Sequence, residues 1–88
     1  MVERTVQIVN SNGLHARPAA EIVKAAARYK SSVTLTRDDL EVNGKSIMGV
    51  MMLAAEYGSM LTLRAEGPDA QDAIEALAAL IANRFGER

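Results

Sequence analysis

The amino-acid sequence predicts an α+β fold, in which a single β-sheet is covered by helices on one face. Four short segments alternate apolar and polar residues, as strands with one buried face do. Three other segments have the apolar spacing or the flanking residues of helices. Their order along the chain is β-α-β-β-α-β-α. Because each strand has one apolar face and each long helix one apolar stripe, helices packed on one side of the sheet bury both.

A polar loop separates the first expected strand from the first expected helix. Between Val2 and Val9, one alternation carries Val2, Val6 and Ile8 and the other carries Glu3, Thr5 and Gln7, which indicates a half-buried strand. Asn10 to Gly13 has the composition of a loop. From His15 to about Lys30 the apolar residues have helical spacing, and Pro18 lies in the first turn, where a missing N–H costs nothing. The first helix is therefore expected to begin at His15.

A β-hairpin and a second helix are expected next. Val33–Thr36 and Leu40–Val42 alternate on either side of a charged turn, as the two strands of a hairpin do. Ser46 is suited to cap a helix from Ile47 to about Tyr57, which Gly58 would end. The short apolar run within that helix is also compatible with a strand.

The last strand and the last helix complete the pattern. Leu61, Leu63 and Ala65 alternate with polar residues, and Gly67-Pro68-Asp69 begins a helix. The apolar stripe of that helix consists of Ala70, Ala73, Ile74, Leu77, Ile81 and Phe85. The first strand, its crossover helix and the second strand form a split β-α-β unit. We expect the fourth strand to fill the gap, antiparallel to both neighbours.

Composition excludes several classes of function. With 88 residues, the chain is expected to form one domain, residues 1–88. A net charge of −1 without a basic stretch argues against binding to nucleic acid. The absence of cysteine excludes disulfides and thiol catalysis, and with one histidine we expect no metal site and no cofactor. No signal sequence and no apolar run of ~18 residues is present, so we expect a soluble cytoplasmic protein without membrane insertion.

The single histidine, His15, lies where a loop meets a helix. A helix start offers unpaired N–H groups and a positive dipole end, which favour a neutral imidazole and can hold an anion. The neutral ring has a lone pair that can attack phosphorus. The amides of Ala16 and Arg17 and the Arg17 guanidinium can stabilise a phosphoryl group, and Asn12 can orient the ring or contact the phosphate. The alternative is that His15 only caps the helix and Arg17 is a solvated charge.

The segment after Ser46 has two interpretations. On a helix, Val50, Leu53, Ala54 and Tyr57 share the face expected to meet the sheet. Ile47, Met48 and Met51 then form an exposed docking patch, which adaptable methionine side chains suit. The alternative is a wholly buried helix in which methionine fills gaps. Ser46 is expected to be an N-cap, and a phosphate on it would place negative charge beside the patch.

Two segments closely resemble the HPr family, the histidine-containing phosphocarriers of the bacterial phosphoenolpyruvate-dependent sugar phosphotransferase system. Gly13–Ala19, GLHARPA, is similar to its phosphohistidine signature, and Lys45–Met51, KSIMGVM, to its regulatory serine segment. The likeness covers essentially the whole chain. It implies an open-faced β-sandwich with a four-stranded antiparallel sheet in order 1-4-2-3 and three helices on one side.

The resemblance also implies a function and partners. His15 would be phosphorylated on Nδ1 by phosphorylated enzyme I and would pass the group to IIA domains of sugar permeases, with Arg17 assisting. Ser46 would be the target of HPr kinase/phosphorylase, and Ile47, Met48 and Met51 would dock partners. Such a chain is a stoichiometric carrier and not an enzyme, and we expect a monomer. The alternative is a regulatory phosphorelay or interaction protein that controls carbon or nitrogen metabolism, for example through a transcriptional regulator. A small binding module with an incidental histidine is disfavoured, because ligand clusters and aromatic platforms are lacking.

Overall fold

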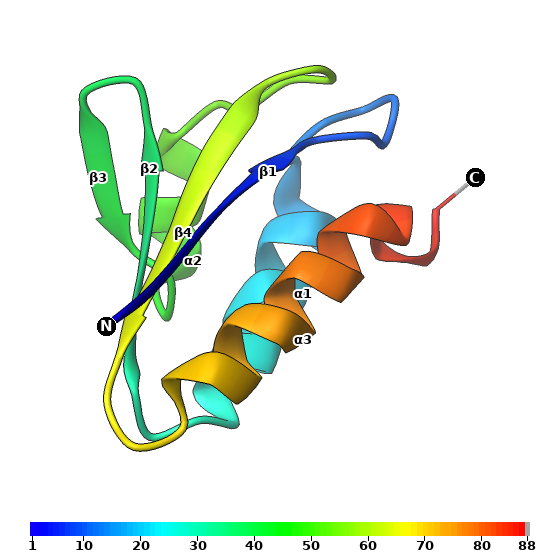
Figure 1. Ribbon diagram of the computed structural model, residues 1–88. Helices are drawn as coiled ribbons and strands as arrows, with labels where there is room; N and C mark the ends of the chain where they lie inside the picture. The colour runs from blue at the N-terminus through cyan, green and yellow to red at the C-terminus, as the bar shows by residue number, and fades with distance from the viewer. Residues whose placement is uncertain (88) are drawn as a thin grey trace.

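The computed structural model describes residues 1–87 and confirms the predicted order of strands and helices (Figure 1). A short 3-10 turn, η1, follows the last helix. The elements are β1 (Val2–Gln7), α1 (Ala16–Ala27), β2 (Ser32–Arg37), β3 (Leu40–Asn43), α2 (Ile47–Met52), β4 (Met60–Glu66), α3 (Ala70–Ala82) and η1 (Arg84–Gly86). None of the helices within residues 1–87 is long and apolar enough to cross a membrane.

The four strands form one antiparallel sheet in the order β1-β4-β2-β3. β4 fills the gap between β1 and β2, as the split β-α-β pattern predicts. Most of its apolar residues lie opposite apolar partners, with Leu61 opposite Val6 of β1 and Leu63 opposite Leu35 of β2, whereas Leu63 faces Arg4 in β1. The three helices cover one face of the sheet and leave the other face open (Figure 1). The structure therefore has the fold class that the sequence predicts.

The core between the sheet and the helices is built mainly from aliphatic side chains. Fully buried residues come from the sheet and from both long helices, and they include Ile22, Leu35, Leu63, Ile74 and Leu77. Phe85 is the single aromatic residue among the buried hydrophobic residues of the described chain. Because helices of this length are marginal alone, packing of α1 and α3 on the sheet is what stabilises them.

Helix α2 ends earlier than the sequence predicts. The periodicity extends it to about Tyr57, but the helix ends at Met52 and Tyr57 is exposed. Ala54 has a φ of 48°, which turns the chain away from the helix axis. Gly58, with a φ of 89°, therefore lies in the turn before β4 and is not the helix stop. The strand alternative for this segment is wrong as well.

A long-range contact accounts for the early end of α2. The guanidinium of Arg37, at the end of β2, donates a hydrogen bond of 3.0 Å to the carbonyl oxygen of Leu53. A cation at this point satisfies a carbonyl that a continued helix would have paired with its own N–H groups. Local periodicity contains no information on such a partner, so the prediction of a longer helix with Ala54 and Tyr57 on its buried face is wrong.

The remaining boundaries differ from the sequence by a few residues. β1 ends at Gln7 and not at Val9, and α1 runs from Ala16 to Ala27 with His15 as its N-cap. α3 ends at Ala82, so Phe85 reaches the core from η1 and not from the helix. Such differences are common because helix ends fray and their last turn is often 3-10.

Asp69 joins the start of α3 to the segment between α1 and β2. Its carboxylate accepts hydrogen bonds from the Ser31 hydroxyl and from the backbone N–H groups of Lys30 and Ser31, the latter two at 2.9 Å. The Ser31 hydroxyl in turn accepts from the Asp69 N–H at 3.1 Å. The hydrogen bond from Ser31, followed by that from Lys30, lowers the pKa of the Asp69 carboxyl to about 2. The ionised carboxylate is therefore part of the folded structure.

We expect Asp69 to make the protein sensitive to acid. A lowered folded-state pKa adds stability above the unfolded value, about 3.9, and this stability is lost as pH falls toward 2. Asp69→Asn should therefore lower the free energy of unfolding at pH 7 and flatten its decline between pH 4 and pH 2. Urea unfolding over this pH range measures both effects. Asp72→Asn, with the same change of charge in the first turn of α3, should follow the wild-type profile. Identical profiles for the two variants would contradict this role of Asp69.

Candidate functional site

His15 is the N-cap of α1 and stands where the loop joins the helix. Its backbone is extended, with φ −78° and ψ −175°, and its carbonyl oxygen accepts the first helical hydrogen bond from Ala19 at 3.0 Å. About 40% of the side chain is exposed, so the ring is reachable from solvent. The predicted position of the histidine at a helix start is confirmed. The imidazole ring does not itself cap the helix, because the His15 side chain makes no capping hydrogen bond.

The first turn of α1 presents hydrogen-bond donors beside this ring. The first N–H groups of a helix have no partner within it, and Pro18 has no N–H, which leaves those of Ala16 and Arg17. The Arg17 side chain is exposed and makes no hydrogen bond or ion pair within residues 1–87. The structure thus brings together His15, Ala16 and Arg17, three of the residues that the sequence predicts for the site. A helix start of this kind is suited to an anion.

The loop before His15 is fixed by backbone contacts. The Leu14 N–H donates to the carbonyl oxygen of Ala55 at 2.8 Å, in the segment between α2 and β4. Gly13 has a φ of 67°, and a Cβ there would lie 2.5 Å from the same oxygen. Only glycine fits this combination of left-handed backbone and close approach. The loop is therefore held against the segment that follows α2.

Two residues of the site, Glu87 and Asn10, are not predicted by the sequence patterns. The Nε2 atom of His15 lies 2.8 Å from Oε2 of Glu87, and the Asn10 side-chain amide donates to Oε1 of Glu87 at 3.0 Å. Asn10 is buried and also donates to the carbonyl oxygen of Gly13 at 2.8 Å. Glu87 is 72 residues from His15, so no local pattern announces this contact.

The position of Asn12 does not fit one of the two roles predicted for it. It is exposed in the loop, and the hydrogen bond of the imidazole ring goes to Glu87. Orientation of the ring by Asn12 is therefore not what the structure shows. The physical reason is that Asn10, not Asn12, points into the molecule, where it meets Gly13 and Glu87. Contact of Asn12 with a bound phosphate stays a prediction.

Ser46 and the docking patch lie on α2, which packs beside α1. The Ser46 hydroxyl oxygen accepts a hydrogen bond from the Gly49 N–H at 3.1 Å, which confirms the predicted N-cap. Ile47, Met48 and Met51 are 45%, 74% and 41% exposed, so the prediction of an exposed patch is confirmed over that of a buried helix. Met52, which the sequence pattern did not single out, is also exposed at 64%. Large exposed apolar side chains of this kind commonly mark an interaction surface.

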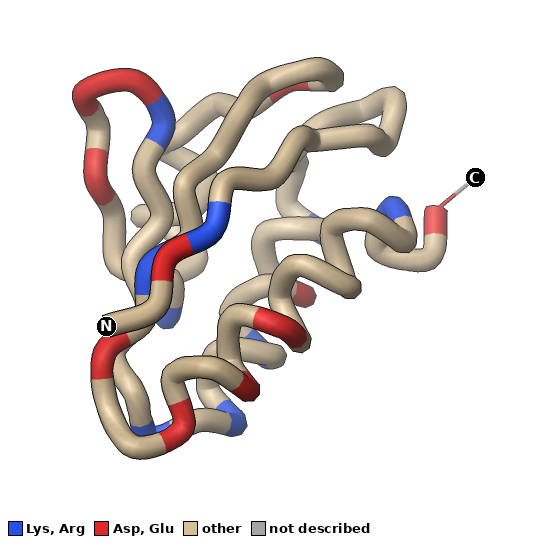
Figure 2. The backbone as a smooth tube through the Cα atoms, viewed as in Figure 1, with Lys and Arg blue, Asp and Glu red and all other residues tan. Residues whose placement is uncertain are grey.

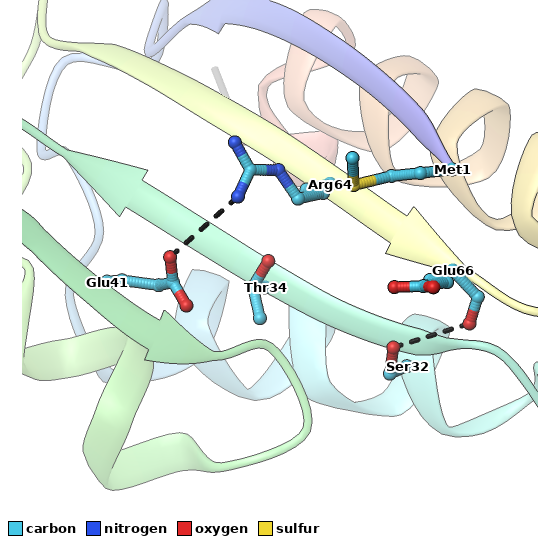
Figure 3. Close-up of a pocket in the computed structure, with 6 residues that line it drawn as sticks. All are labelled: Met1, Ser32, Thr34, Glu41, Arg64 and Glu66. Atoms are coloured by element: carbon cyan, nitrogen blue, oxygen red, sulfur yellow. Dashed lines mark hydrogen bonds and ion pairs between the residues drawn. The ribbon is translucent and has the colours of Figure 1, made fainter.

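The open face of the sheet carries a separate hollow of about 230 Å³ around Arg64 (Figure 3). Arg64 is already paired: its Nε and Nη2 atoms donate to Glu3 at 2.9 and 2.7 Å, and Nη1 lies 3.9 Å from Glu41. The hollow shares no lining residue with the histidine site. Acidic and basic residues are interspersed along the chain (Figure 2). The histidine site is therefore the better candidate.

The arrangement around His15 can accept an anionic group. A half-exposed imidazole is held through one ring nitrogen, which leaves the other for attack. Amide donors, a helix dipole and an unpaired guanidinium lie on the same first turn to balance the incoming charge. Phosphoryl transfer requires mainly such positioning and charge stabilisation.

Comparison with known proteins gives consistent results. Residues 2–83 match the family model described as PTS HPr component phosphorylation site. The chain is 53% identical over 87 residues to the phosphocarrier protein HPr of Cupriavidus necator, covering 99% of this chain and 98% of the relative. It is 48% identical to the HPr-like protein Crh of Bacillus subtilis, covering 92% and 95%. The crystal structure of HPr-C-His from Thermoanaerobacter tengcongensis superimposes with a TM-score of 0.96 at 46% identity, covering 100% and 99% of the two chains.

Gly13→Ala should destabilise the protein by about 3 kcal/mol, because it combines a left-handed alanine with a steric clash. Gly58→Ala is the matched control, since Gly58 also has a positive φ but a Cβ there would meet no heavy atom within 4 Å. That control should lose only about 1 kcal/mol. Urea unfolding at pH 7 measures both values. Equal losses would mean that the approach to Ala55 is not a tight constraint.

Proposed function

The chain belongs to the HPr family of phosphocarriers of the phosphotransferase system, and we propose that it carries phosphoryl groups on His15. In this proposal His15 accepts the group from phosphorylated enzyme I, for which phosphoenolpyruvate is the source. It then passes the group to IIA domains of sugar permeases. The protein is modified and regenerated once per transfer and has no turnover alone, so it acts as a carrier in the cytoplasm and not as an enzyme.

The observation that carries the proposal is the exposed ring of His15 at an open helix start. In the proposed step, the Nδ1 lone pair attacks phosphorus while the bond from phosphorus to the donor breaks. In this proposal the N–H groups of Ala16 and Arg17 and the Arg17 guanidinium balance the charge of the phosphoryl oxygens, and the Asn12 amide contacts them as well. Onward transfer is the reverse step with another acceptor.

The docking patch supports the same proposal. The exposed patch of Ile47, Met48 and Met51 lies on α2, which packs beside α1. A partner that covers the patch therefore lies close to the helix that begins at His15. Methionine side chains adapt to different surfaces, which suits a carrier that must meet both a donor and several acceptors. We therefore assign binding of enzyme I and IIA domains to this patch.

A second candidate function is regulation through Ser46. The observation that favours it is the partly exposed Ser46 hydroxyl at the N-terminus of α2, next to the docking patch. Likeness to Crh of Bacillus subtilis, which is described as catabolite repression HPr, supports it as well. In this proposal HPr kinase/phosphorylase modifies Ser46, and the modified chain acts on carbon or nitrogen metabolism, for example through a transcriptional regulator. The phosphate would be tolerated at the helix start and would change the charge beside the patch.

The two candidate functions are separated by the stability of the adduct. Phosphoenolpyruvate and enzyme I should give an acid-labile adduct of one phosphate that is lost in His15→Ala and kept in Ser46→Ala. ATP and HPr kinase/phosphorylase should give an acid-stable adduct with the opposite pattern. Intact-mass measurement before and after acid treatment detects each. A labile adduct that persists in His15→Ala would rule out His15 as the acceptor.

Arg17→Glu should slow transfer through His15 by about 100-fold, because it replaces a charge that stabilises the phosphoryl oxygens with one that repels them. The fold should lose less than about 0.5 kcal/mol, since the side chain is exposed at a helix start where an acidic residue is tolerated. Rapid-quench assays of transfer and urea unfolding measure the two effects. Arg4→Glu makes the same change of charge on β1 and should leave the transfer rate unaltered. Equal effects on transfer and stability would make Arg17 a structural residue.

A further inference from the structure

The segment after α3 turns back on itself in an unusual backbone conformation. Arg84 and Phe85 both have a φ of 56°, and Gly86 follows with a φ of 76°. Left-handed conformations are unfavourable for residues other than glycine, and two in succession are rare. Strain of this kind persists where the surrounding structure determines it, often beside a functional site. The contacts of this segment therefore indicate which side chain the strained turn holds in place.

The contacts that hold the turn are a buried ring and a bound carboxylate. Phe85 is only 6% exposed and joins the hydrophobic core. The Glu87 N–H donates to the carbonyl oxygen of Arg84 at 2.8 Å, which closes the turn. Figure 1 shows this red segment at the same end of the helical layer as the start of α1. As a result, the Glu87 side chain, only 14% exposed, is directed onto His15 and not into solvent.

Asn10 fixes the other oxygen of the same carboxylate. Its side-chain amide donates to Oε1 of Glu87 at 3.0 Å and to the carbonyl oxygen of Gly13 at 2.8 Å, while its own oxygen has no partner within the described chain. Both acceptors require the amide nitrogen, so the orientation of Asn10 is determined. The loop, the returning segment and the imidazole thus form one connected network that leaves Glu87 little freedom.

We propose that Glu87 is a positioning residue for phosphoryl transfer, whose carboxylate holds the Nε2–H form of His15 and leaves the Nδ1 lone pair available. The inference rests on the proposed function of His15 and deepens it. The 2.8 Å separation of Nε2 and Oε2 suits a hydrogen bond from the ring to a carboxylate. In other sites where histidine acts as a ligand, base or nucleophile, a neighbouring group commonly orients the ring through the nitrogen that does not react.

The carboxylate also has a role in the charge balance of the step. When the Nδ1 lone pair forms its bond to phosphorus, the electron pair of the breaking bond leaves with the donor. The proton on Nε2 stays on the ring, which then carries positive charge. Glu87, in contact with that proton, stabilises the charged ring, and the charge is removed again when the phosphoryl group moves on. No proton has to enter or leave the ring during either transfer.

The first test uses the unphosphorylated protein. Ring nitrogen chemical shifts of ¹⁵N-labelled His15 report which nitrogen carries the proton in the neutral form. We expect the Nε2–H form in the wild type and a mixture with the Nδ1–H form in Glu87→Ala. Glu87→Gln keeps one acceptor oxygen, for which the Asn10 amide and the His15 ring compete, so it should retain more of the Nε2–H form than Glu87→Ala and less than the wild type. Glu21→Gln removes one acidic charge from α1 without contact to the ring and should match the wild type.

The second test measures transfer from phosphorylated enzyme I. Glu87→Ala and Glu87→Gln should both be about tenfold slower than the wild type, because both lack the charge that stabilises the phosphorylated ring. Wild-type rates in Glu87→Ala, or ring shifts that do not respond to loss of the carboxylate, would overturn the inference. Slow transfer in Glu87→Ala with a full return to the wild-type rate in Glu87→Gln would overturn the charge role. If the wild type itself accepts no phosphate, the proposed function fails, and the ring shifts still decide whether Glu87 sets the proton position.

Discussion

The hydrogen bond from the Leu14 N–H to the Ala55 carbonyl oxygen is the contact on which the site depends. It ties the loop before α1 to the segment after α2, two parts of the chain that are 41 residues apart, from position 14 to position 55. Gly13 permits the close approach, and the end of α2 at Met52 releases Ala55 to supply the oxygen. Without this contact, the loop before His15 would be held only by Asn10 and by the contact of the ring with Glu87.

The exposure of His15 suits the proposed function. A carrier that transfers a group through this ring would present it to a donor and to an acceptor, and a deep pocket around His15 would exclude both. Precision comes instead from backbone contacts of the loop and from a network below the ring, in which Asn10 is buried and Glu87 nearly so. The strained turn at Arg84 and Phe85 contributes to this network. Burial of Phe85 in the core compensates for the unfavourable backbone conformation, and the turn brings Glu87 to His15.

Sequence patterns predicted those parts of the structure that local periodicity and capping determine. The four strands, the position of His15 at a helix start, the Ser46 cap and the exposure of Met48 follow from alternation, spacing and hydroxyl chemistry within a few residues. The order of the strands follows from the split β-α-β pattern. The misses share a cause. The end of α2 is set by Arg37, and the orientation of the His15 ring by Glu87, partners 16 and 72 residues away. No window of local sequence contains such pairs.

The geometry of α2 also separates the two proposed roles of the protein. Ser46 lies at the start of this helix, whereas the segment beyond its end holds the His15 loop through Ala55. A phosphate on Ser46 would offer new acceptor oxygens to the same helix start that the hydroxyl now caps, so the helix would keep its favourable N-terminal interaction. The main change would then be negative charge beside Ile47 and Met48, on the surface that partners have to cover. Control through Ser46 would therefore act on docking, while the chemistry of His15 would retain its amides, its guanidinium and its contact with Glu87.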